Sequence, residues 1–310
     1  MQRRAFLRGL LVTGALPSLP SVTHALEPVT RMAEGSPSRT AQGAAVLRAC
    51  HQILDRPPIL DDALALRILG PRLEASVRAN PDPRRAGLRA FVALRSRFAE
   101  DRLARAVHRG VRQYVILGAG LDTFAYRNPF PASRLRVFEI DHPATQAWKL
   151  ARLREVGIDV PDSLTFVPID FERQALSAEL GRAGFRADEP AFFSWLGVVV
   201  YLTRDAVMAT LSFIATLASG TEVVFDYGLP SSALSERERA FRETAAERVA
   251  AVGEPWLTFF DPAALALDLT DIGFGDVEDI GPQRASDRYF ANRTDGLRIG
   301  NAGRLMRAVL

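Results

Sequence analysis

Two hydrophobic patterns follow each other along the chain. In the first, apolar residues recur three or four positions apart, which predicts helices over residues 41–54, 61–69 and 84–107. From residue 111 onward, short apolar runs alternate with amphipathic stretches. This second pattern predicts a mostly parallel sheet that is covered by helices on both faces. The sequence therefore indicates a helical cap followed by an α/β domain.

The apolar runs of the second part mark the expected strands. Stretches with helical periodicity separate them, and the last two runs would pair as an antiparallel hairpin. Charges at most positions of segment 236–249 predict a helix that forms a solvated lid or cap face rather than a partner site. Strands are expected at 113–117, 136–141, 164–170, 191–195, 198–201, 222–227, 273–280 and 304–310, and helices at 144–155, 172–180, 204–218, 236–249 and after 262.

Candidate chemistry appears where the first predicted strand ends. It runs directly into Gly118-Ala119-Gly120, and the next strand, about twenty residues later, ends in Asp141. Glycines let the backbone approach a ligand closely, and an acid at the second strand's end accepts both ribose hydroxyls of an adenosine. This layout predicts a nucleotide-binding site. The alternative is that these glycines bind no ligand and only form a tight turn between a strand and a helix.

The residues after the glycines narrow the choice of nucleotide. A pyrophosphate loop needs a third glycine, so that the following helix packs closely and points its amino end at phosphate. That position is Thr123 here, and Asp122 places a carboxylate where the anion would lie. S-adenosylmethionine fits better, because it combines an adenosine with a sulfonium cation and an amino-acid tail. Asp122 could alternatively cap a helix.

Composition excludes several classes of protein. The 310 residues include 39 basic and 36 acidic side chains, and Arg3, Arg4 and Arg8 account for the excess. A nucleic-acid footprint is therefore not expected. One cysteine and four scattered histidines provide neither a disulfide nor metal-ligand spacing, so no metal is expected. No apolar run reaches the length of a membrane-spanning helix.

The amino-terminal segment stands apart from the predicted fold. Arg3-Arg4-Ala5-Phe6-Leu7-Arg8 resembles a twin-arginine export signal, and a loose cleavage site follows at Ala25. Cofactor supply favours the cytoplasm instead, in which case residues 1–25 are a disordered leader. The predicted domains are this leader, a helical cap over 26–110 and an S-adenosylmethionine-binding domain over 111–310.

Six motifs occur in a fixed order from residue 38 onward. They are Ser38–Ala41, Arg95–Phe98, Val115–Thr123, Phe138–Pro143, Val167–Phe171, and Phe193–Val198 with Tyr201–Thr203. In this order, the chain resembles the leucine carboxyl methyltransferase family, in its bacterial branch of S-adenosylmethionine-dependent methyltransferases. The resemblance implies a Rossmann-like class I methyltransferase sheet with a helical cap, a closing hairpin, and S-adenosylmethionine as the cofactor.

The resemblance assigns the cofactor's methionine and ribose to three positions. Gly118 and Gly120 match the loop under the methionine moiety, and Asp141 matches the ribose-binding acid.

Three further positions follow from the same resemblance. Arg97 matches the arginine that holds the methionine carboxylate, a task that suits a bidentate guanidinium. Asp170 and Phe171 match the residues that flank the adenine. The alternative for Arg97 is a solvated surface arginine, and for Asp170 a helix cap.

The methyl acceptor is defined less sharply. A carboxylate is already ionised at neutral pH, whereas a hydroxyl usually needs a general base, for which His142, Tyr201 and Asp226 are candidates. Each of the three could instead be a helix-entry residue or a buried polar group. Leu196 stands where the eukaryotic enzymes of the family carry a glutamate. We therefore expect a small-molecule acceptor rather than a protein, with O-methylation of a carboxylate or hydroxyl. The enzyme is expected to be a monomer or weak homodimer.

Two other classes of function stay open on the sequence. An NAD(P)-dependent oxidoreductase also has an acid about twenty residues past its glycines. A protein could also bind S-adenosylmethionine without catalysis, as a sensor or partner subunit.

Overall fold

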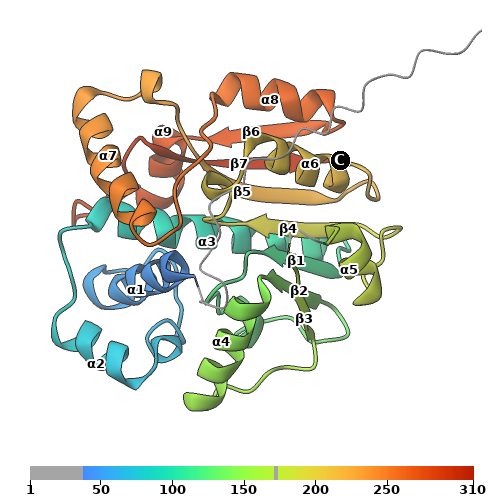
Figure 1. Ribbon diagram of the computed structural model, residues 1–310, viewed down its shortest axis with the longest axis horizontal. Coiled ribbons are helices and arrows are strands. Elements are labelled where there is room, and N and C mark those ends of the chain that lie inside the picture. The colour runs from blue at the N-terminus through green and yellow to red at the C-terminus, as the bar shows by residue number, and fades with distance from the viewer. Residues whose placement is uncertain (1–37, 171–173) are drawn as a thin grey trace, which may run out of the picture.

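One seven-stranded sheet forms the centre of the protein in the computed structural model, which describes residues 38–170 and 174–310 (Figure 1). The strands are β1 (Gln113–Leu117), β2 (Arg136–Asp141), β3 (Leu164–Pro168), β4 (Ala191–Trp195), β5 (Glu222–Gly228), β6 (Asp276–Ile280) and β7 (Gly303–Val309). Their order is β3-β2-β1-β4-β5-β7-β6, and β7 is antiparallel to both of its neighbours, whereas β1 to β5 are parallel. The predicted sheet with its closing hairpin is confirmed.

Helices cover both faces of the sheet and one of its ends. The α-helices are α1 (Arg39–Leu54), α2 (Pro71–Ala79), α3 (Ala86–His108), α4 (Pro143–Glu155), α5 (Leu176–Arg182), α6 (Arg204–Ala215), α7 (Glu236–Ala250), α8 (Pro262–Asp271) and α9 (Pro282–Ala285). Short turns are η1 (Arg67–Leu69), η2 (Phe124–Tyr126), η3 (Val199–Tyr201), η4 (Ser231–Ala233) and a π-type turn over Ser286–Phe290. No helix among residues 38–170 and 174–310 is both long and apolar enough to cross a membrane.

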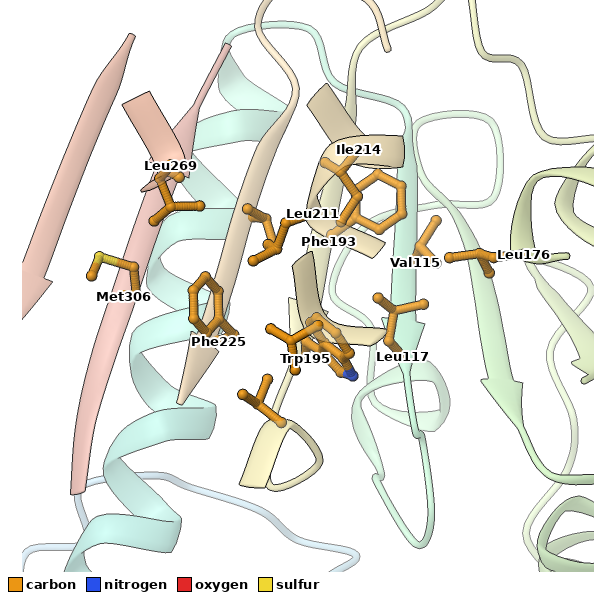
Figure 2. Packing of buried hydrophobic residues seen from close by; sticks show 14 of the residues in the cluster. Val115, Leu117, Leu176, Phe193, Trp195, Leu211, Ile214, Phe225, Leu269 and Met306 are labelled. Atoms are coloured by element: carbon orange, nitrogen blue, oxygen red, sulfur yellow. The ribbon is translucent and has the colours of Figure 1, made fainter. Parts of the chain in front are cut away.

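Successive side chains of each parallel strand enter two different hydrophobic layers. On β1, Val115 and Leu117 join the layer under α5, α6 and α8, whereas Tyr114 and Ile116 join the layer under α3. Figure 2 shows the first layer, in which Phe193 of β4 and other strand residues meet the helix residues. All five residues of β1 are buried, as expected for a strand with helices on both sides.

The predicted cap is attached to the sheet by α3. Its apolar residues, among them Phe98 and Leu103, share one hydrophobic cluster with strand residues such as Val137 and Phe192. A second, smaller cluster joins α1 and α2 to Leu153 of α4. The cap–domain boundary placed at residue 110 stays a prediction, because the packing runs continuously across it.

Two predicted elements differ from the structure. Residues 198–201 are not a strand: β4 ends at Trp195, and Gly197 adopts a left-handed φ of 73° that turns the chain into η3. Over 61–69 only the last three residues are helical. There the side chain of Asp62 accepts the N–H of Leu64 and so competes with a helix start. Helix α2 was not predicted.

Candidate cofactor site

The carboxyl ends of the parallel strands form the candidate site. Helices α1 and α7 lie beyond the end of β4, on the left of Figure 1. Open α/β sheets bind their ligands at this edge, where the strand order reverses. Here the chain proceeds from β1 through β2 to β3 on one side, and then continues with β4 on the other side of β1. The strand order therefore reverses between β1 and β4. The glycine loop leaves β1 at that point.

Both loop glycines are required by the backbone. Gly118 and Gly120 have left-handed φ values of 69° and 47°, which other residues rarely adopt. A Cβ on Gly118 would lie 2.3 Å from the side chain of Val198, and one on Gly120 would lie 3.0 Å from Ala41 at the start of α1. The loop is therefore packed between the turn after β4 and the first turn of the cap.

Asp141 faces this loop from the end of β2. One carboxylate oxygen accepts the N–H of Gly120 at 2.5 Å, and the other accepts its neighbour His142 N–H at 2.7 Å. Burial raises the pKa of Asp141, and these two hydrogen bonds oppose the increase. Because a carboxylate can accept about four hydrogen bonds, acceptor capacity remains on both oxygens. The structure thus brings the glycine loop and Asp141 together, and the binding of ribose by Asp141 stays a prediction.

Thr123, at the position of a third loop glycine, has a structural role. Its hydroxyl donates to Asp62 at 2.7 Å, and Arg48 of α1 donates to the same carboxylate at 2.7 Å. The side chain of Asp122 accepts the N–H of Phe124 at 2.8 Å, which forms a local turn just before η2. The cap and the glycine loop are therefore joined through a buried carboxylate, a link that spacing along the chain does not reveal.

The adenine-flanking predictions are only partly visible in the structure. Asp170 follows β3 directly after Ile169, whose N–H donates to the carbonyl of Asp141 at 2.9 Å. The backbone N–H of Asp170 donates to the side-chain oxygen of Gln174 at 3.0 Å. Asp170 therefore lies next to the predicted ribose acid. Phe171 lies outside the described residues, as do residues 1–25 with the suspected export signal.

Arg97 does not join this group. Its guanidinium donates to Asp101 at 2.8 Å, one turn further along α3, and to the carbonyl of Ile59 at 3.3 Å. The side chain is 46% exposed. Its role as a cofactor ligand stays a prediction, for which this placement gives no support.

Arg95, two residues earlier, points to the strand ends instead. Its guanidinium lies so close to Gly197 that a Cβ there would be 2.6 Å from Nη2, and Nη1 donates to Asp226 of β5 at 3.1 Å. Only 14% of the Arg95 side chain is exposed. Sequence reasoning missed this residue, although it lies in the same motif as Arg97.

The three candidate bases differ in their surroundings. His142 accepts the N–H of Ala144 through Nδ1 at 3.2 Å, so it is the amino-terminal cap of α4. Asp226 is held by Arg95 and by the N–H of Gly197. Tyr201 ends η3 and is partly buried. His142 and Asp226 therefore each have a structural role, the first as a helix cap and the second as the acceptor that holds the Gly197 turn.

Helix α7 and the segment that follows it, as far as Leu257, contact the start of the cap and are called the cover below. Glu254, which follows α7, accepts the N–H of Arg39 at 2.8 Å and the hydroxyl of Ser38 at 3.0 Å. It also accepts the N–H and hydroxyl of Thr40. Three residues on, Leu257 donates to the carbonyl of Val200 in η3 at 2.7 Å. This segment bridges α1 and the turn after β4, the two elements that pack on the glycine loop.

Relatives of the chain agree with this architecture. Residues 41–215, more than half of the chain, match the family model described as leucine carboxyl methyltransferase. The chain belongs to the leucine carboxyl methyltransferase family. A protein of Bacillus subtilis (strain 168) named "Putative S-adenosyl-L-methionine-dependent methyltransferase YktD" is 31% identical over 291 residues, which cover 86% of this chain and 95% of that protein. A protein of Mycolicibacterium paratuberculosis (strain ATCC BAA-968 / K-10) with the same description is 33% identical over 218 residues, 64% of this chain and 68% of that one.

Solved structures share the fold at much lower identity. A DUF574 family protein from Streptomyces avermitilis MA-4680 has a TM-score of 0.52 at 16% identity, over 90% of this chain and 99% of that one. The CurJ carbon methyltransferase has a TM-score of 0.50 at 14% identity, over 87% of this chain and 66% of that one. The predicted Rossmann-like class I methyltransferase fold is confirmed. The fold alone does not select an acceptor atom.

Proposed function

We propose that the protein transfers a methyl group from S-adenosylmethionine to an oxygen of a small molecule. The observation that carries the proposal is the Asp141 carboxylate, which meets the glycine loop and keeps acceptor capacity for the two ribose hydroxyls. Family membership supports the same cofactor, because relatives are named as S-adenosyl-L-methionine-dependent methyltransferases.

The loop geometry favours this cofactor over a dinucleotide. A pyrophosphate site needs the amino end of a helix directly behind the glycines. Between β1 and β2, where every residue is described, the one helical element is the three-residue turn η2. The hydroxyl of Thr123 is bound to Asp62, and Asp122 adds a negative charge beside the loop. These features suit a sulfonium and oppose a pyrophosphate, which weighs against the oxidoreductase alternative.

Arg95 is the residue that we propose for the methionine carboxylate. Within residues 38–170 and 174–310, the guanidinium of Arg95 donates to Asp226 through Nη1 alone. A guanidinium carries five N–H donors, so further donors remain for a ligand carboxylate. With Gly118 and Gly120 under the methionine and Asp170 near the adenine, these residues would hold the cofactor along the edge from β5 to β3.

S-adenosylmethionine, when bound, supplies an activated methyl group for in-line displacement. The chain's own contribution is then to orient the partners and exclude water, which can lower a barrier by several kcal/mol. His142 and Asp226 are engaged in structural hydrogen bonds. This favours an acceptor that needs no general base, and a carboxylate is such an acceptor.

Ligand titration would test the cofactor assignment. Calorimetry of the full chain with S-adenosylhomocysteine should give micromolar binding by the wild type. Asp141→Ala should weaken it at least about tenfold, because two charge-assisted hydrogen bonds to ribose are lost. The matched control is Asp159→Ala, an exposed aspartate beyond α4. No binding by a folded wild type would contradict the proposal.

Product chemistry would test the reaction. With a methyl-labelled cofactor and a library of small acids and phenols, a methyl ester releases labelled methanol in mild alkali, whereas an ether retains the label. Transfer to nitrogen or carbon would contradict O-methylation. Binding without turnover across the library would favour the non-catalytic alternative.

A further inference from the structure

We infer that Asp226 is a positioning residue: it holds the Arg95 guanidinium against the Gly197 turn, ready for the carboxylate of the cofactor's methionine. This inference rests on the proposed function. The described side-chain hydrogen bonds of Asp226 go to Arg95 and Gly197, not to the loop glycines or Asp141, so it would act through Arg95.

The two oxygens of Asp226 have separate partners. Oδ1 accepts the N–H of Gly197, the residue with left-handed φ after β4, and Oδ2 accepts Nη1 of Arg95 at 3.1 Å. Side-chain exposures are 11% for Asp226 and 14% for Arg95. One carboxylate therefore ties together α3, the β4 turn and β5, three elements that are far apart in the sequence.

The turn also reaches the glycine loop. Val198 follows Gly197 and packs on the open face of Gly118. Arg95 contacts the same turn, where a Cβ at Gly197 would lie 2.6–2.9 Å from its guanidinium atoms. The guanidinium is therefore fixed in relation to the loop that would lie under the methionine. A free arginine would lose rotamer entropy on binding a ligand, and one already held by Asp226 loses less.

Asp226 could instead serve only to hold the turn. The two roles separate on replacement by asparagine, since its amide oxygen can still accept the Gly197 N–H but no longer pairs with a cation. A positioning role predicts that Asp226→Asn harms only ligands with a carboxylate. A purely structural role predicts equal effects on all ligands, or none.

The experiment compares two ligands on the full chain. S-adenosylhomocysteine carries the amino-acid tail, and 5′-methylthioadenosine has the same nucleoside and sulfur without it. For Asp226→Asn we expect roughly tenfold weaker binding of S-adenosylhomocysteine and less than about twofold change for methylthioadenosine. Arg95→Gln should show the same selectivity, and the double variant should be no weaker than Arg95→Gln alone, because the two residues act as one unit.

Matched variants make each outcome decisive. Asp268→Asn removes a charge from another arginine–aspartate pair, between α6 and α8, and should change neither affinity. Equal loss of both ligands in Asp226→Asn, or no loss of either, would overturn the inference. If Asp226→Asn does not fold, Arg95→Gln tests the pair without touching the Gly197 hydrogen bond. Selective loss in Arg97→Ala rather than Arg95→Gln would assign the carboxylate to Arg97 and also overturn it. Failure of the wild type to bind S-adenosylhomocysteine would instead remove the proposed function itself.

Discussion

Helices α3 and α7 are both long and rich in charge, yet their environments are opposite. Twelve of the 23 residues of α3 are buried, including two arginines, Arg89 and Arg102. None of the 15 residues of α7 is buried. Charge content therefore does not decide which helix lies inside the protein. Two things differ: α3 has an apolar face that packs in the hydrophobic core, and its buried arginines have partners on other elements.

The arginines of α3 meet carboxylates from distant parts of the chain. Arg102 donates to Glu222 of β5 at 2.7 Å, and Arg89 forms two hydrogen bonds of 2.8 Å with Asp55. On α7, by contrast, Glu238 has a local partner and an exposed one: it closes a capping box with Ser235 and accepts from Asn301. A buried charged helix thus needs a receiving structure, whereas a solvated one does not.

The largest effect is expected where α3 meets the sheet. Glu222 is fully buried and accepts from Arg102, Arg109 and Arg307. Glu222→Ala leaves these cations without their common carboxylate, so the free energy of unfolding should fall by about 3–5 kcal/mol, measured by urea denaturation. The matched change on α7, Glu247→Ala, removes an exposed carboxylate and should stay within about 0.5 kcal/mol of wild type. Similar values for the two variants would erase the contrast between the helices.

The same contrast explains what the sequence could and could not reveal about the site. The strands, the glycine loop and Asp141 follow from local patterns, because a buried parallel strand and a left-handed glycine leave a signature within a few residues. The choice between Arg95 and Arg97 does not. Two residues apart on a helix, they point about 160° away from each other, and both fit an arginine motif. Gly197 and Asp226, both a hundred residues or more downstream, show which of them faces the strand ends.

Two predicted elements, the helix over 61–69 and the strand over 198–201, were wrong for a related reason. The apolar spacing over 61–69 is helical, but Asp62 is bound to Arg48 and Thr123, which hold it outside a helix. Residues 198–201 are apolar enough for a strand, and the turn at Gly197 prevents it. In each case a tertiary contact overrides the local preference.

A second ion pair of α3 predicts a pH effect of intermediate size. Burial alone would raise the pKa of Asp55, but hydrogen bonds from Arg89 and His51 outweigh it and lower the pKa to about 2. Because the folded pKa lies below the unfolded one, the stabilisation is complete above about pH 4 and is lost as the pH falls toward 2. The stability gap between wild type and Asp55→Asn should therefore shrink by about 2 kcal/mol over that range, in urea titrations at several pH values. A gap that is constant from pH 6 to pH 2 would show that Asp55 is not paired as an anion.

The smallest effect on stability is expected at the cover, where it should be local. Glu254→Ala removes the acceptor for the first turn of α1 and should cost about 1 kcal/mol, comparable with the loss of a helix cap. Since α7 has no buried residue, it can detach with little exposure of apolar surface. Hydrogen exchange in Glu254→Ala should therefore accelerate roughly fivefold across α7 and stay unchanged in α3, and Glu247→Ala should alter neither helix. Acceleration in both helices would mean that the cover and the cap open as one unit, which would contradict the division drawn between them.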